Sequence, residues 1–196
     1  MFMGLMAAIG GLLFLLIVIG VVLLVVVLWA VAVYNRFISR RNLVKESWAQ
    51  IDVQMKRRYD LIPNVVETVK GYAKHERETF ENVTKARNMA MNAGNVQDRA
   101  QAENMLTGAL KTLFAVAENY PELKANQNFL GLQEELAGTE NRIGFARQHY
   151  NDVVRDYNVG IQQVPANIIA GAFGFKEEPY FQVEELAARE APKVQF

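Results

Sequence analysis

Charged side chains are absent from residues 1–35, and nearly all of these residues are apolar. A helix needs about 20 apolar residues to cross a bilayer core about 30 Å thick. The pattern therefore predicts a transmembrane helix, whose span is marked by Ile9, Gly11, Gly20, Trp29 and Val33. A cleaved signal peptide is the alternative, but its start is basic and its apolar core is only about 7–15 residues long. This run is uncharged and longer, so we expect a retained anchor.

Apolar residues then recur at heptad spacing over residues 36–93. The pattern predicts one long amphipathic helix that continues from the anchor without a loop. We expect Pro63 to kink this helix rather than break it, because the apolar phase continues through the proline, and Gly71 is a further weak point. The residues of this face that we expect in the core of a bundle are Trp48, Ile51, Met55 and Ile62.

Two further helices are predicted, over residues 96–119 and 126–163. In the later one, apolar residues alternate three and four apart over four heptads, as in a coiled coil. Asn141, Asn151 and Asn158 lie beside this seam, and we expect them to set its register through hydrogen bonds. The seam residues assigned to the core are Phe129, Leu132, Leu136, Ile143 and Tyr150.

Shorter segments complete the chain. Residues 122–126 are expected to be partly helical, and residues 165–175 to form a short helical turn that caps the bundle through Ile168, Ile169, Phe173 and Phe175. The predicted fold class is all-α: an N-terminal transmembrane helix followed by an antiparallel bundle of long, coiled-coil-like helices. The corresponding domains are an anchor (1–35), a helical bundle (36–175) and a C-terminal tail (176–196).

The charge balance narrows the partners and the location. The chain has 21 basic and 21 acidic residues, which gives no indication of nucleic-acid binding. It has no cysteine, so disulfides and thiolate chemistry are excluded. Basic residues follow the span at Arg36, Arg40, Arg41 and Lys45. By the positive-inside rule, we expect a single-pass protein of the bacterial cell membrane with its N-terminus outside and its helical domain in the cytoplasm.

Candidate catalytic residues are few. His75 and His149 lie on different predicted helices, without the second ligand that a helical zinc site requires. The cluster from Arg57 to Asp60 is interpreted as a salt-bridge network between helices, with binding of a phosphate or carboxylate as the alternative. We therefore expect no enzyme activity, no catalytic or metal site and no cofactor.

Small residues recur four apart in the span, at Gly4 and Ala8 and at Ala7 and Gly11. This spacing lets two membrane helices approach closely. The apolar run is also longer than a bilayer requires, and we expect neighbouring copies to cover the surplus. Membrane lipid and further copies of the chain are thus the expected partners, beside a protein partner of unknown identity.

Several long segments resemble the LemA family. They are residues 48–76 (WAQIDVQMKRRYDLIPNVVETVKGYAKHE), 120–129 (YPELKANQNF) and 146–151 (ARQHYN), with the closing Pro165 and Gly174. The resemblance covers about residues 34–181. It implies a short outer N-terminus, one membrane span and a cytoplasmic antiparallel helical domain. The family also includes a magnetosome membrane protein, and it supplies no catalytic activity or cofactor.

These observations favour a non-enzymatic, membrane-anchored scaffold that self-associates and organises membrane or partner proteins. One alternative is an accessory subunit of a membrane peptidase or transporter. Another is a signalling subunit in which His75 or His149 accepts phosphate.

Overall fold

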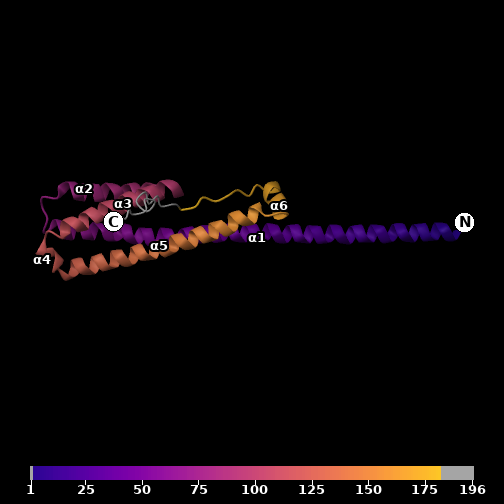
Figure 1. The fold of residues 1–196 in the computed structure, drawn as a ribbon, viewed down its shortest axis with the longest axis horizontal. Coiled ribbons are helices and arrows are strands. Elements are labelled where there is room, and N and C mark those ends of the chain that lie inside the picture. The colour runs from indigo at the N-terminus through magenta and orange to yellow at the C-terminus, as the bar shows by residue number, and fades with distance from the viewer. Residues whose placement is uncertain (1, 182–196) are drawn as a thin grey trace, which may run out of the picture. The chain divides into compact units, whose positions relative to one another are not determined.

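The computed structural model describes the backbone of residues 2–181 and the side chains from residue 10 onward. Residues 182–196 of the predicted tail, the side chain of Ile9 and those of Gly4, Ala7 and Ala8 lie outside the described part. The backbone of residues 2–181 is helical without a strand, which confirms the all-α prediction. The helices are α1 (Phe2–Lys70), α2 (Arg77–Asn92), α3 (Val96–Ala117), α4 (Pro121–Lys124), α5 (Gln127–Gln162) and α6 (Ala166–Ala172) (Figure 1).

Helix α1 carries both the apolar segment and the first part of the amphipathic stripe, so the expected absence of a loop between them is confirmed. It also continues through Pro63. A proline inside a helix has no N–H for the carbonyl four residues earlier, here that of Tyr59. The Nε of Arg87 on α2 donates to this carbonyl oxygen at 2.7 Å. The freed acceptor is therefore satisfied from a neighbouring helix.

The prediction of one helix over residues 36–93 is wrong, because the chain turns between Lys70 and Arg77. Gly71 follows the last residue of α1, and the amides of Tyr72 and Ala73 both donate to the carbonyl of Val69. Short-range backbone hydrogen bonds of this kind close the end of a helix, and glycine is favoured just after such an end. The heptad pattern nevertheless continues, because α2 buries Phe80, Val83, Ala86 and Ala90.

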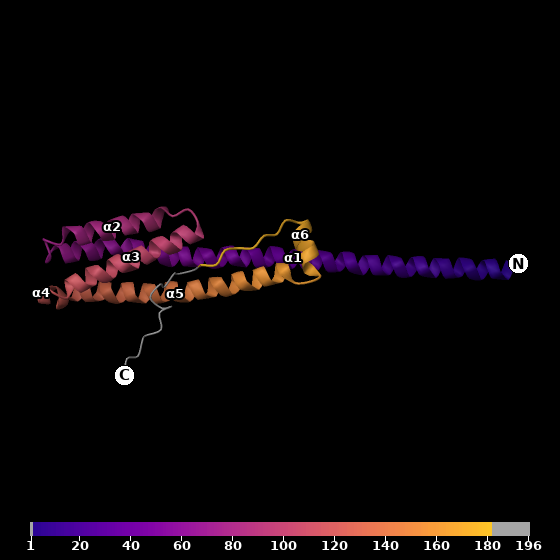
Figure 2. The same ribbon diagram turned by 45° about the horizontal axis from the view of Figure 1, so that its top comes forward.

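The described chain divides into two compact units. The larger one comprises Val44–Arg155 and the segment from Pro179. Within it, Trp48 pairs with Tyr150 and Arg57 with Glu135, so α1 and α5 run antiparallel. In contrast, residues later on α1 contact residues later on α3, so these two helices run parallel. Figures 1 and 2 both show α2 and α3 as an antiparallel hairpin within this unit.

The smaller unit comprises the chain up to Leu43 together with Asp156–Glu178. Helix α6 ends at Ala172, and Gly174, two residues later, has a φ of 69°, at which glycine is favoured; the amide of Phe175 donates to the carbonyl of Ala170. Ala170 is buried, but Ile168 and Phe173 are exposed. The cap over the bundle that we expected of these side chains stays a prediction, and within this unit the Phe173 ring lies against that of Tyr34.

Residues 176–181, the C-terminal segment, are fastened to α5 by asparagine side chains. Asn158 donates to the carbonyl of Glu178 at 2.9 Å and accepts from its amide at 2.9 Å. Asn151 makes the same pair of bonds with Phe181, at 3.0 and 2.8 Å. The sequence suggested that these asparagines set the helix register. Asn151 and Asn158 instead hold the non-helical C-terminal segment, and Asn141 is exposed.

Candidate functional site

The apolar part of α1 is the first feature with a functional meaning. All residues from 10 to 29 are exposed, and α1 contains an 18-residue window with a mean hydropathy of 3.5 and nothing buried. Gly11 and Gly20 have open space where a Cβ would lie, Trp29 is exposed and Val33 is half-buried. By length and composition this helix can cross a membrane.

The basic residues after the predicted span have two kinds of environment. Arg36 and Lys45 are exposed. Arg40 is half-buried and donates to the carbonyl of Asp156 at 2.5 Å, and the Arg41 guanidinium lies 5.5 Å from the ring centre of Phe175. Two of the four side chains thus already contact groups of their own unit.

The residues assigned to the bundle core lie mostly inside it. Trp48 and Leu132 are half-buried, and the Trp48 ring lies 5.4 Å from that of Tyr150 and 6.0 Å from that of Phe181. The buried ones are Ile51, Met55, Ile62, Phe129, Leu136, Ile143 and Tyr150.

A buried polar cluster joins α1, α3 and α5. Glu103, with 0% of its surface exposed, accepts from Arg58 at 2.9 Å and from the hydroxyl of Tyr59. Arg58 also donates to Thr107 at 2.9 Å and pairs with Glu140 at 2.8 Å. The structure thus places Arg57, Arg58 and Tyr59 in links between helices, as expected of a salt-bridge network.

The electrostatics of this polar cluster favour a structural role. Burial, assisted by the charge of Glu103 and the hydrogen bond to it, raises the pKa of the Tyr59 hydroxyl. Burial lowers the pKa of the Arg147 guanidinium, which lies 3.5 Å from Glu103. A tyrosine that stays protonated and a fully enclosed carboxylate are suited to linking helices and are closed to a substrate.

Glu103 was not recognised as a core residue from the sequence. A signal was present, however, because Glu103 precedes Leu106, Leu110 and Leu113 at alternating spacings of three and four. Such a seam position faces the other helices even when its side chain is charged. A carboxylate there predicts a buried basic partner, and the structure supplies Arg58.

The remaining candidates for chemistry are dispersed. His75 is exposed in the turn after α1, not on a helix as predicted, and His149 is exposed on α5. Among the described residues, no three His, Asp or Glu side chains are grouped as a metal site requires.

Two of the open grooves in the larger unit contain side chains considered above. One, of about 950 Å³, lies along α2 and contains Lys70 and Arg77, but each of these is paired with a glutamate on its own helix. The other, of about 450 Å³, lies between α1 and α5. It is lined by Gln50, Val53, Gln54, Arg142, Phe145, Ala146 and His149.

In a comparison with known protein families, residues 47–196 match the LemA family. The chain belongs to the LemA family. The resemblance noted in the sequence is thereby confirmed, and the match begins one residue before Trp48 of the bundle.

Individual relatives of this LemA-family chain are distant. Magnetosome protein MamQ 2 of Paramagnetospirillum magneticum is 25% identical over 175 residues, which cover 76% of this chain and 64% of MamQ 2. MamQ of Magnetospirillum gryphiswaldense is 24% identical over 174 residues, with the same two coverages. Protein LemA of Metamycoplasma hominis is 25% identical over 157 residues, covering 78% of this chain and 70% of that protein. The match thus spans less than two thirds of each MamQ protein.

Proposed function

We propose that this LemA-family chain is a membrane-anchored, non-enzymatic helical scaffold that self-associates and organises membrane or partner proteins. The exposed apolar segment of α1 is the observation that carries the proposal. Soluble proteins rarely leave so large an apolar surface uncovered. The enclosed ionic cluster of the bundle and its relatives among magnetosome proteins also support a structural role.

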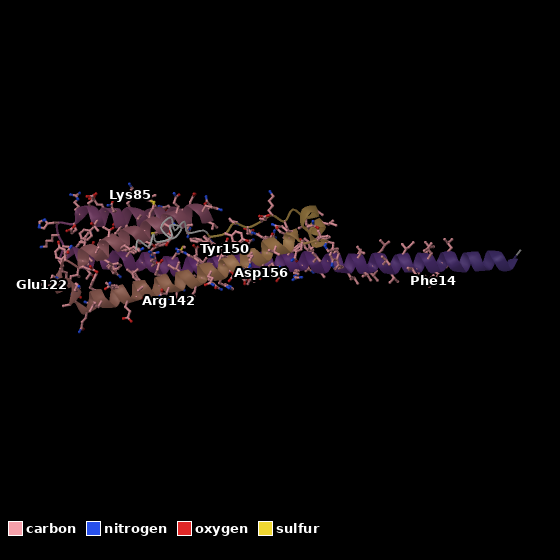
Figure 3. All side chains as sticks on the ribbon, viewed as in Figure 1. Phe14, Lys85, Glu122, Arg142, Tyr150 and Asp156 are labelled. Carbon is pink, nitrogen blue, oxygen red and sulfur yellow. The ribbon has the colours of Figure 1, made fainter. Side chains whose placement is uncertain are left out.

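The proposed location is the bacterial cell membrane, with a single span and the bundle in the cytoplasm. The basic residues that follow the span support this orientation. The chain lacks cysteine, so one introduced thiol reports alone. Lys85 is exposed on α2, where Figure 3 labels it, and Lys85→Cys is a suitable reporter. In intact cells, a membrane-impermeant maleimide should leave this thiol unlabelled, and it should react with the thiol after lysis. Labelling before lysis would contradict the proposed orientation and place the bundle outside the cell.

Self-association is proposed to use the groove between α1 and α5. Phe145 is 74% exposed there, and Val53 on the opposite helix is also exposed. A second copy would bury both side chains, and copies anchored in one membrane share an orientation that favours side-by-side pairing.

A photoreactive residue in place of Phe145 tests this interface in cells. The expected product is a crosslinked dimer of twice the chain's mass, whereas the same residue in place of Leu130, exposed elsewhere on α5, should give none. A product with a different mass would instead support the alternative, an accessory or signalling subunit whose partner occupies the groove. Native mass measurement of the detergent-extracted chain that found only monomer would refute self-association.

A further inference from the structure

A second apolar feature lies in the smaller unit, around α6. Residues 164–175 contain no charged side chain, and Asn167 is their one strongly polar residue. Three large apolar side chains of this segment are exposed: Val164 by 81%, Ile168 by 68% and Phe173 by 62%. A segment with this composition lacks the polar face that a water-exposed surface helix normally presents.

Aromatic contacts fix this segment against one short part of α1. The ring of Phe173 lies 4.8 Å from that of Tyr34, and the ring of Phe175 lies 5.7 Å from Tyr34 and 5.2 Å from Phe37. Arg41 lies over the Phe175 ring. The segment is thus held beside the residues that directly follow the exposed stretch of α1.

The C-terminal end of that stretch gives the depth of α6. Arg36 is the first charged residue of the chain, and aromatic and basic residues typically mark the membrane interface, so the hydrocarbon core is placed to end near Trp29. Tyr34 lies five residues further, about 7.5 Å along the helix. The headgroup layer is roughly 5–8 Å thick on each side. Tyr34 and the Phe173 ring against it therefore lie at the level of the headgroups.

We propose that residues 164–175, with α6 at their centre, form a foot that inserts into the headgroup–acyl boundary of the membrane that α1 crosses. This inference rests on the proposed membrane anchoring. Lipid is the occupant favoured by the continuity of the exposed apolar side chains with the span, and aromatic rings such as Tyr34 and Trp29 are typical of this level. Tyr34 and Phe37, which follow the apolar run, are then covered by the chain's own Phe173 and Phe175 instead of a neighbouring copy.

Single cysteines labelled with an environment-sensitive fluorophore test the foot in the full chain, reconstituted into vesicles of mixed zwitterionic and anionic lipid. Leu24→Cys reports the bilayer core, and Ser39→Cys, about 15 Å beyond Trp29, reports the aqueous side. Ile168→Cys reports the foot, and Val164→Cys is a second probe of it. Both foot side chains are exposed, so the substitutions leave the packing of the unit intact.

The expected result is a blue-shifted emission at Ile168 and Val164, quenched by lipids spin-labelled near the headgroup at least about twofold more than at Ser39. If lipids spin-labelled deep in the acyl chain quench Leu24 but both foot positions behave like Ser39, the foot is wrong and the anchor stands. If these lipids do not quench Leu24, the proposed membrane anchoring itself fails. A blue-shifted but unquenched foot would show a protein cover, such as a second copy, and would also overturn the proposal.

Discussion

Arg57 and Arg58 offer a matched test of how burial changes the contribution of an ion pair. Each arginine of α1 pairs with a glutamate of another helix, Arg57 with Glu135 at 2.7 Å and Arg58 with Glu103 at 2.9 Å. The first pair is 53% and 39% exposed, whereas the second is 3% and 0% exposed. The two arginines thus differ strongly in solvent access, and Arg58 also contacts Glu140 and Thr107.

Replacement of each arginine by leucine should separate these cases. Arg58→Leu leaves the Glu103 carboxylate enclosed with only Arg147 and the Tyr59 hydroxyl, and removal of one partner of a buried pair costs about 3–5 kcal/mol. Loss of the exposed Arg57 pair costs at most about 1 kcal/mol. At about 2–4 °C per kcal/mol for a chain of this size, Arg58→Leu should lower Tm by roughly 6–20 °C, and Arg57→Leu by at most about 4 °C.

The assay is thermal unfolding of the full chain in detergent micelles, followed by circular dichroism. The double variant Arg58→Leu, Glu103→Leu completes the cycle, because it removes both charges of the buried pair, and the Glu140 carboxylate that then loses Arg58 is 41% exposed. The free energy of unfolding that the double variant loses should be smaller than the sum of the losses of Arg58→Leu and Glu103→Leu by about 0.5–3 kcal/mol. Equal Tm shifts for Arg57→Leu and Arg58→Leu, or simple additivity in the double variant, would refute the argument that burial makes this pair matter.

Three further predictions concern the larger unit. Arg87→Met leaves the Tyr59 carbonyl without a donor, so urea unfolding should show a loss of about 1–3 kcal/mol that shrinks when Pro63→Ala restores the backbone donor. Asn151→Ala removes two bonds to the C-terminal segment, which a protease should then cut faster than in the exposed control Asn141→Ala. Because the pKa of Tyr59 is raised in the folded chain, the unfolded chain loses this proton first, and stability should fall as pH rises above about 10; urea titrations of Tyr59→Phe should show a weaker fall.

The helices whose ends carry clear local start and stop signals were predictable from the sequence. Helix α3 follows Asn95, whose side chain accepts from the amide of Asp98, and α5 ends shortly before Pro165. Both signals are local, so they can be recognised without knowledge of the packing. The apolar seam of α5 could also be recognised from the sequence, because it repeats regularly over the length of the helix.

The turn after Lys70 could not be recognised in this way. Buried residues on both sides of it, such as Val69 and Phe80, keep one heptad phase, so the apolar pattern reads through the break. Pro63 is the stronger local signal for a break, yet the helix continues there because Arg87 supplies the missing donor from another helix. A long-range contact thus decided between two local signals.

The polar cluster was foreseen only in part. The run from Arg57 to Asp60 indicated interhelical ion pairs, but its partner Glu103 lies among apolar residues of a later helix. Which of two adjacent arginines is enclosed depends on how three helices pack, and charge patterns in the sequence do not contain that information.

The antiparallel pairing of α1 with α5 affects the order of events at the ribosome. Arg57 and its partner are 78 residues apart in the chain. At a synthesis rate of about 5–20 residues per second, the second helix follows the first after roughly 4–16 s. During that interval Ile51, Met55 and Ile62 of α1, which are buried in the complete fold, lack the helices that are synthesised later. The incomplete bundle therefore exposes apolar side chains that the complete fold buries, and such surface favours aggregation.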